Sequence, residues 1–105
     1  MTRISKKEQH KLLYRAILQL QDEEECYEFF QDLCTVSELR AMEQRFEVAS
    51  LLYEGQIYSD IFQRTGASSA TISRVSRSLN YGTGAYERLL RQLRREESSR
   101  KGGPA

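Results

Sequence analysis

The chain of 105 residues has one histidine, one proline, two cysteines and no tryptophan. So few histidines and cysteines leave almost no ligands for a zinc site, and Cys26 and Cys34, eight positions apart in one expected helix, are too distant for a disulfide. No apolar run approaches the roughly 18 residues that a membrane span needs, and the first residues lack the apolar centre of a signal peptide. We therefore expect a cytoplasmic protein with no metal or other cofactor and no membrane partner.

Groups that could carry catalysis are also scarce. His10, the single histidine, lies in a charged segment whose neighbours suggest no acid–base partner. Gly82 and Gly84 lack the rest of any phosphate-binding fingerprint. The acidic run at residues 23–25 is typical of the first turn of a helix, where negative charge suits the helix dipole. We predict that the protein is not an enzyme.

Charge is divided unevenly along the chain, although the formal net charge is only +1. Residues 1–54 carry seven basic and eleven acidic side chains, a net of −4, whereas residues 55–105 carry nine and four, a net of +5. Between residues 61 and 86 stand Arg64, Arg74 and Arg77 and no acid. This division indicates a cationic working surface on one part of the fold, with chance clustering of solvated charges as the alternative.

The hydrophobic pattern predicts an all-α fold of about six helices, because apolar residues recur at helical spacing and no segment alternates as a strand does. We expect a first helix over residues 6–20 and a second after Asp22, a good N-cap. Thr35 and Glu38 form a capping box before the longest helix, and Gly55 suits its left-handed C-terminal cap. The apolar stripe expected on this longest helix comprises Val36, Leu39, Met42, Phe46, Ala49, Leu52 and Tyr53.

A last helix is predicted over residues 85–97, after a linker at residues 80–84. Its arginines are expected on a solvated face, some of them paired with acidic neighbours. Its apolar stripe comprises Tyr86, Leu89, Leu90 and Leu93. Residues 98–105 have the composition of a disordered tail. The length allows one domain, so residues 1–97 are expected to form a single helical domain.

Residues 58–79 predict a helix-turn-helix. A short helix over residues 58–65 ends at Gly66, which suits the left-handed backbone of such turns, and a second helix begins at Ser68 or Ser69. The residues expected to pack between these two helices are Ile61, Thr65, Ile72, Val75 and Leu79.

Small uncharged residues surround the start of the second helix and would let it approach base edges closely. These residues are Ala67, Ser68, Ser69, Ala70 and Ser73. Arg74 and Arg77 reach further, toward bases or phosphates. An ordinary helical hairpin with a polar outer face is the alternative. The turn glycine, the small residues and the acid-free arginines together favour DNA binding.

Residues 33–52 (LCTVSELRAMEQRFEVASLL) resemble the central helix region of the Trp repressor family, and residues 65–82 (TGASSATISRVSRSLNYG) resemble its reading head. The resemblance covers about residues 10–93 and is to the Trp-repressor-related branch rather than to the tryptophan sensor itself. It implies a six-helix subunit in an intertwined homodimer, whose reading heads meet successive major grooves of double-stranded DNA. Apolar stripes on the other four helices of so short a chain are consistent with burial against a partner.

The resemblance also assigns roles to individual residues. The family's base-reading positions match Ser69, Ala70 and Ser73, which could read bases through bridging waters. The full set of predicted DNA-contacting residues is Tyr58, Ser59, Arg64, Ser68, Ser69, Ala70, Ser73, Arg74 and Arg77. The family's corepressor-pocket positions match Thr35, Arg45, Thr71, Arg74, Val75 and Ser78. Val75 stands where the pocket needs glycine and would fill the space for the indole ring, so tryptophan is not expected as the effector. A different ligand and no ligand both stay open.

Phe62 is a second departure. Helix-turn-helix units usually carry alanine four residues before the turn glycine, so that the two helices cross closely. Either the crossing opens up here, or the phenyl ring points outward toward the DNA backbone, where the tryptophan sensor has a lysine. We predict the outward placement.

These features together predict a sequence-specific DNA-binding transcriptional regulator, a repressor by its resemblance, that acts as a homodimer. The alternative is a helical protein–protein interaction module that does not bind DNA and docks through the acidic residues 22–28. The sequence identifies neither the operator nor a small-molecule effector.

Overall fold

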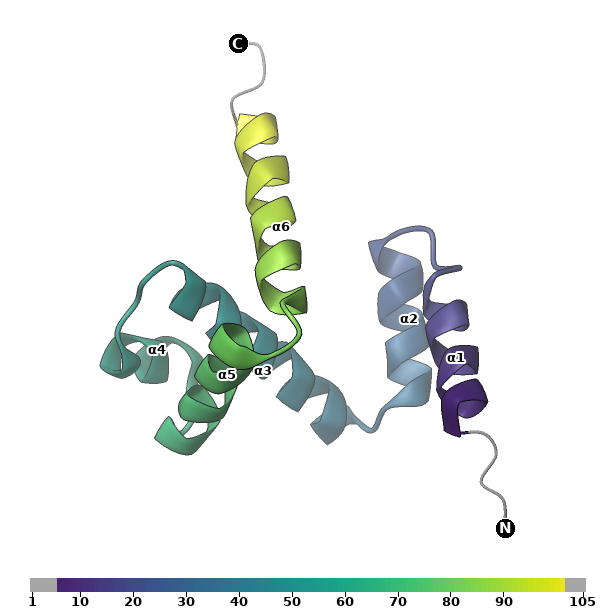
Figure 1. Ribbon diagram of the computed structural model, residues 1–105, viewed down its shortest axis with the longest axis horizontal. Coiled ribbons are helices and arrows are strands. Elements are labelled where there is room, and N and C mark those ends of the chain that lie inside the picture. Colours follow the sequence, from purple (N-terminus) through teal and green to yellow (C-terminus); the bar gives the residue numbers. More distant parts are fainter. Residues whose placement is uncertain (1–5, 102–105) are drawn as a thin grey trace. The chain divides into compact units, whose positions relative to one another are not determined.

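The computed structural model describes residues 6–101, which form six helices and contain no strand (Figure 1). The predicted all-α fold class and number of helices are therefore confirmed. The chain divides within its third helix into two compact units, Met1–Leu39 and Arg40–Ala105, and the expectation of a single domain stays a prediction. The helices are α1 (Lys6–Ile17), α2 (Glu23–Leu33), α3 (Val36–Tyr53), α4 (Tyr58–Thr65), α5 (Ser69–Tyr81) and α6 (Ala85–Lys101).

In the first unit, side-chain caps begin the helices at the places that the sequence predicts. The Oδ1 atom of Asp22 accepts a hydrogen bond from the backbone N–H of Glu25 (2.9 Å) at the start of α2. Before α3, the N–H of Thr35 donates to Oε1 of Glu38 (2.9 Å), and the N–H of Glu38 donates to Oγ1 of Thr35 (3.1 Å). The predicted capping box is confirmed.

Two helix ends in the first unit differ from expectation. α1 ends at Ile17 rather than at residue 20, because the N–H groups of Gln19 and Leu20 bond to carbonyls three residues earlier and tighten the chain into a turn. α2 ends at Leu33, and Cys34 is its C-cap with an extended backbone (φ −110°), so the two cysteines do not share a regular helix. Both cysteines are half-buried.

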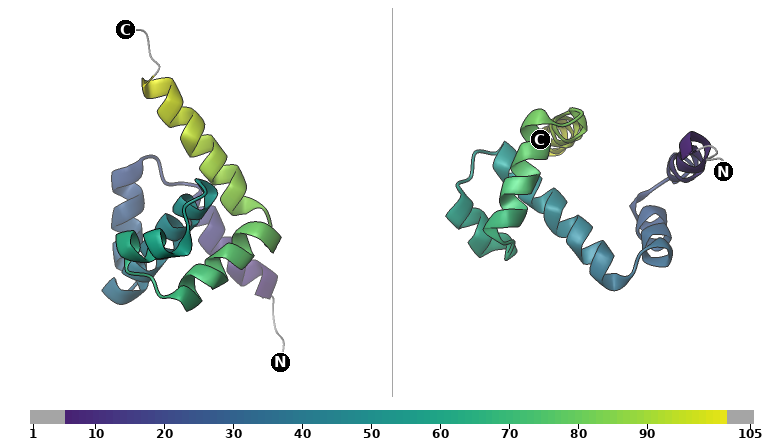
Figure 2. Two further views of the ribbon diagram at one scale, coloured as in Figure 1. Left: turned by 90° about the vertical axis from the view of Figure 1, so that its left-hand side faces the viewer. Right: turned by 60° about the horizontal axis from the view of Figure 1, so that its bottom comes forward.

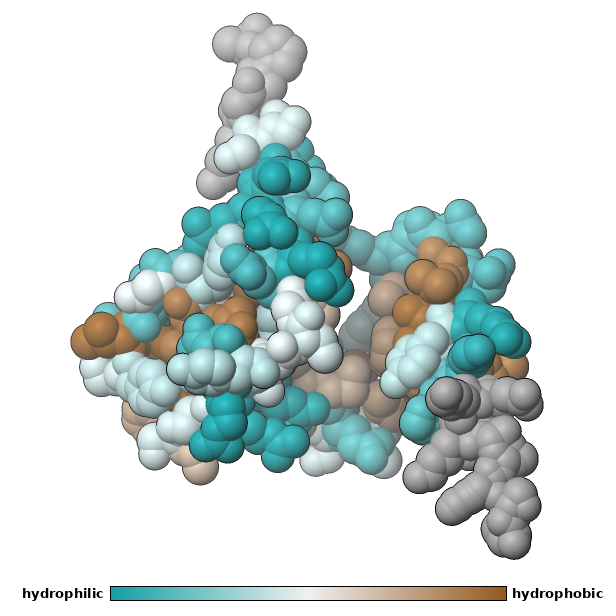
Figure 3. All heavy atoms as spheres, in the orientation of Figure 1, coloured by the Kyte–Doolittle hydropathy of each residue, from teal (hydrophilic) through white to brown (hydrophobic). Residues whose placement is uncertain are grey.

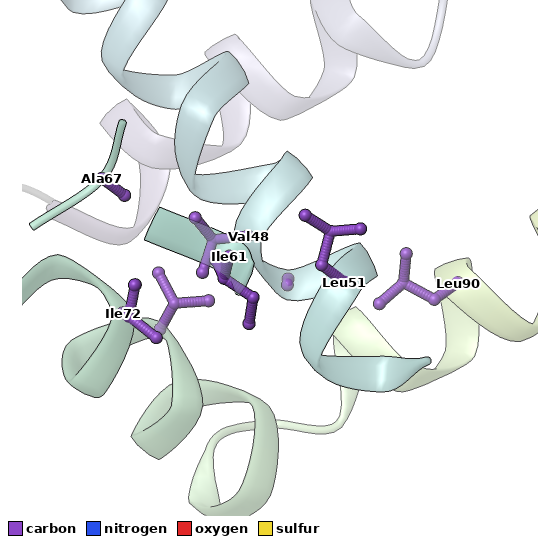
Figure 4. Packing of buried hydrophobic residues seen from close by; sticks show 8 residues of the cluster. Val48, Leu51, Ile61, Ala67, Ile72 and Leu90 are labelled. Atoms are coloured by element: carbon purple, nitrogen blue, oxygen red, sulfur yellow. The ribbon is translucent and has the colours of Figure 1, made fainter. Parts of the chain in front are cut away.

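The second unit has one hydrophobic core, to which α3, α4, α5 and α6 all contribute (Figure 4). The views of Figures 1 and 2 agree in placing α4 and α5 beside the C-terminal half of α3. The core residues are Val48, Ala49, Leu51, Ile61, Ala67, Ile72, Val75 and Leu90, each less than a tenth exposed.

α3 buries a different set of side chains from the predicted stripe. Leu39 and Ala49 are buried as expected, but Val36 is 74% exposed. Val48 and Leu51, which the stripe omits, are core residues. The reason is that α3 is apolar on more than one side, so helical spacing alone does not decide which side faces the core.

The last two helices are longer than predicted. α5 continues to Tyr81, immediately before Gly82, where a Cβ would collide with the carbonyl oxygen of Ser78. α6 continues to Lys101, four residues past Glu97, because no glycine or proline interrupts it there. The end of the last helix expected at residue 97 is therefore wrong: residues 98–101 are helical, and residues 102–105 of the expected tail lie outside the described residues.

Side chains near the start and in the middle of α6 contact the C-terminal half of α3 and the residue that follows it. The Phe46 and Tyr86 rings lie 5.9 Å apart between centroids. The Arg94 guanidinium lies 5.1 Å from the centre of the Tyr53 ring and 3.8 Å from the Glu54 carboxylate, directly after α3. The predicted pairing of α6 arginines with neighbouring acids is confirmed for one pair, Arg91 with Glu87 (3.6 Å).

Candidate nucleic-acid interface

The turn between α4 and α5 is built around Gly66. Its backbone is left-handed (φ 75°, ψ 4°), as predicted, and its N–H donates to the carbonyl of Phe62 (2.8 Å). The hydroxyl of Thr65 donates to the carbonyl of Ile61 (2.8 Å) and accepts from the N–H of Ala67 (3.1 Å). One side chain therefore ties the end of α4 to the start of the loop that leads into α5.

A second tie holds this turn to α3. The side-chain amide of Gln44 donates to the carbonyl of Thr65 (3.1 Å) in a partly buried position. A carbonyl in the last turn of a helix has no partner within the helix, so this bond satisfies a group that would otherwise be left unpaired. The bond therefore fixes the end of α4, and with it the turn of the helix-turn-helix, against α3.

Ser68 begins α5 as its N-cap. Its Oγ accepts from the N–H of Thr71 (3.1 Å), and its hydroxyl lies 3.2 Å from Oγ1 of Thr71. Ser68 was predicted to contact DNA, and the structure shows that its side chain also serves the helix start.

α5 has two clearly separated faces. Ile72 and Val75 are 1% and 2% exposed and point into the core. Ser69, Ser73 and Arg77 follow one another at intervals of four residues, so they form a row along the outer face. All three side chains of this outer row are exposed in the part of the chain that the structure describes.

All nine predicted DNA-contacting residues are exposed on α4, on α5 or at the start of α5. They are Tyr58, Ser59, Arg64, Ser68, Ser69, Ala70, Ser73, Arg74 and Arg77. Among the described residues, no carboxylate forms an ion pair with Arg64, Arg74 or Arg77, whereas Arg91 and Arg94 of α6 each have one. The charge of the helix-turn-helix arginines is therefore available to an external anion.

The exposure of two residues beside this surface, Phe62 and Ala67, tests what the sequence predicts for them. Phe62 is 56% exposed, so the predicted outward placement of its ring is confirmed. Ala67, expected among the small residues that lie close to DNA, is 1% exposed and belongs to the core. It is small because the turn presses it against the core, and that part of the prediction is wrong.

The corepressor-pocket positions are distributed over both units. Thr35 lies in the first unit, where its hydroxyl caps α3. In the second unit Arg45, Arg74 and Ser78 are exposed and Thr71 is half-buried. Val75 is buried in the core together with Ile61 and Ile72. The residue that the resemblance matches to the pocket glycine therefore belongs to the core of the second unit.

Thr65 and Gln44 are the structurally important residues that sequence reasoning missed or understated. Thr65 was expected between the helices, but its role as a double hydrogen-bonding partner was not. A threonine directly before the turn glycine is the only local signal for it. Gln44 gives no local signal, because it lies 21 positions from its partner.

No metal centre is formed by the described part of the chain: no three His, Cys, Asp or Glu side chains come together there in a way that could hold an ion. Likewise, no helix within residues 6–101 combines the length and the apolar character needed to cross a membrane.

Comparison with known proteins places this helix-turn-helix in a family. The sequence model described as "Trp repressor protein" matches residues 8–94. The chain belongs to the Trp repressor family. The uncharacterized protein YerC of Bacillus subtilis (strain 168) is 54% identical over 86 residues, which cover 82% of this chain and 83% of YerC.

Solved structures agree with the membership of the Trp repressor family. A crystal structure of a TrpR-like protein from Eubacterium eligens ATCC 27750 is 51% identical with a TM-score of 0.81, covering 84% of this chain and 91% of that one. A second crystal structure, of a chain from Staphylococcus aureus, is 45% identical with a TM-score of 0.81, covering 90% and 96%. The Trp repressor family consists of regulators rather than enzymes.

Proposed function

We propose that this protein is a sequence-specific DNA-binding transcriptional regulator, a repressor, that acts as a homodimer through α4 and α5. The observation that carries the proposal is the division of α5 into a buried apolar face and an outer face of small residues and arginines. A helix of this kind can enter a major groove, because small side chains let its backbone approach the base edges.

Each outer residue has a role that fits its chemistry. Ser69 and Ser73 lie near the start of α5, the part of a reading helix that contacts base edges, and their hydroxyls can donate or accept. Ala70 offers a methyl group to the thymine methyl. Arg64 and Arg77 neutralise phosphates and hold the helix in register, and Arg74 reaches bases.

A homodimer is supported by apolar side chains that the single chain leaves uncovered. They lie on α1 or directly after it and on α2, α3 and α6, outside the helix-turn-helix. The exposed aliphatic side chains among them are Leu12 (70%), Leu18 (80%), Leu33 (50%), Val36 (74%), Leu89 (50%) and Leu93 (46%). So many large apolar groups on a chain this small favour a surface that a partner covers.

A salt series tests the proposal. If Arg64 and Arg77 of two chains each neutralise a phosphate, affinity for duplex genomic fragments should fall roughly 10²-fold between 50 and 200 mM salt. Mobility shifts measure this fall, and light scattering on the same samples should give the mass of two chains. Binding that ignores salt, or no binding at low salt, would contradict the proposal.

Two substitutions separate phosphate contacts from base contacts. Arg77→Ala should weaken binding to all sequences alike and reduce the slope of log affinity against log salt by about 1 per reading head. Ser73→Ala should leave that slope unchanged and alter the preference between sites by about 1–3 kcal/mol. Competition between unrelated fragments measures both, and identical behaviour of the two variants would refute the division of roles.

No specific observation favours the alternative, which is an interaction module that docks through residues 22–28. Asp22 caps α2, and Oε1 of Glu25 accepts from the N–H of Gln21 (2.8 Å). The start of α2 therefore accounts for the acidic residues 22–25 of this stretch.

A further inference from the structure

The outer side of α4 carries two exposed aromatic rings. Tyr58 and Phe62 are 41% and 56% exposed, whereas Ile61, next to Phe62, is fully buried. Residues four positions apart lie on the same side of a helix, so the two rings form one aromatic surface. Hydrophobic atoms gather over α4 at the left of Figure 3.

The Phe62 side chain does not pack in the core of the second unit. It belongs neither to the buried cluster nor to the half-buried side chains packed against that cluster. A phenyl ring left in water on a helix whose opposite side is well packed suggests an external contact. Asp60, the acidic residue of α4, stands two positions before Phe62 and so projects from a different side of the helix.

We propose that Tyr58 and Phe62 anchor the sugar–phosphate backbone of DNA beside the groove that α5 enters. The Phe62 ring packs on a deoxyribose, and the Tyr58 hydroxyl donates to the adjoining phosphate. This inference rests on the proposed function, because the first helix of a DNA-bound helix-turn-helix crosses the backbone.

The chemistry of the backbone explains how an uncharged ring can serve there. Phosphates alternate with sugars, whose C–H groups form the apolar part of the strand. A phenyl ring cannot bond a phosphate, but it loses exposed apolar surface when it covers a sugar. Tyrosine hydroxyls are among the groups that bond phosphate oxygens in protein–DNA complexes. Such a contact adds affinity for every sequence and releases no counterion.

The first test is Phe62→Ala in mobility shifts over the same salt series. The Kd should rise about tenfold on all duplexes, as expected for a loss of about 1.4 kcal/mol, and the salt slope should stay that of the unsubstituted protein. Phe62→Lys should make the slope steeper by about 0.9 for each reading head, because a cation at this position meets a phosphate. Tyr81→Ala is the control. It removes an aromatic side chain that is 85% exposed at the C-terminal end of α5, and it should change neither the Kd nor the salt slope.

The outcomes separate this inference from the proposed function. Failure of the unsubstituted protein to bind at low salt overturns the proposed function. Normal binding by Phe62→Ala, or a weakening equal to that of Tyr81→Ala, overturns the inference alone. If Phe62→Ala lowers the melting temperature, Phe62→Lys decides the question: a steeper salt slope supports the contact, and an unchanged salt slope opposes it.

Discussion

Replacing Ile61 with alanine should lower the free energy of unfolding by about 2–5 kcal/mol. Ile61 is fully buried on α4, where it packs in the same cluster as Val48 of α3 and Ile72 of α5 (Figure 4). Removing three carbons there leaves a cavity between α3 and the helix-turn-helix. Urea denaturation at fixed protein concentration measures the loss, which is a large part of the stability of a small domain.

The adjacent residue is the matched control. Phe62→Ala removes a larger side chain, but one that is 56% exposed, and should cost less than about 1 kcal/mol. Circular dichroism at the same protein concentration should therefore show a much larger fall in melting temperature for Ile61→Ala than for Phe62→Ala. Equal falls would contradict the assignment of the two residues to opposite sides of α4.

Val75→Gly should cost about 3 kcal/mol. Val75 is 2% exposed in the core, so its loss opens a cavity, and glycine within a helix adds about 1 kcal/mol by itself. Val75→Ala, which makes most of the cavity but keeps the helix propensity, separates the two contributions. Urea denaturation of the three proteins measures them, and a Val75→Gly variant as stable as the unsubstituted protein would show that the core does not need this side chain.

The same residue bears on the effector. Because the resemblance places Val75 where an indole ring would lie, L-tryptophan should not change the melting temperature of the unsubstituted protein. A ligand at 100 times its Kd would stabilise the folded state by about 2.7 kcal/mol, which is an easily measured shift. A saturable rise in melting temperature with L-tryptophan would overturn the proposal that tryptophan is not the effector.

Features set by short stretches of chain could be predicted from the sequence. The Asp22 cap, the Thr35–Glu38 capping box and the left-handed Gly66 each depend on residues within four positions of one another. The bounds of α4 follow for the same reason. Such signals act before any tertiary contact forms, so one sequence suffices to find them.

Features set by contacts between distant residues could not be predicted from the sequence. The sequence does not show which side of α3 meets the core, and so Val36 was expected inside while Leu51 was missed. The bond from Gln44 to Thr65 joins two helices and has no local pattern. For the candidate interface, all nine predicted residues are exposed, whereas their contacts with DNA stay a prediction.

The uneven burial of α6 along its length has a consequence for local unfolding. Leu90 is the one buried side chain among residues 85–100 of α6, and every residue from Arg91 to Arg100 is exposed. In a single chain the free energy needed to open the end of α6 is therefore small, and its amides should exchange with solvent early. A partner that covers Leu89 and Leu93 would slow this exchange. Amide protection in α6 would then report assembly of two chains, and protection in α5 would report folding of the second unit.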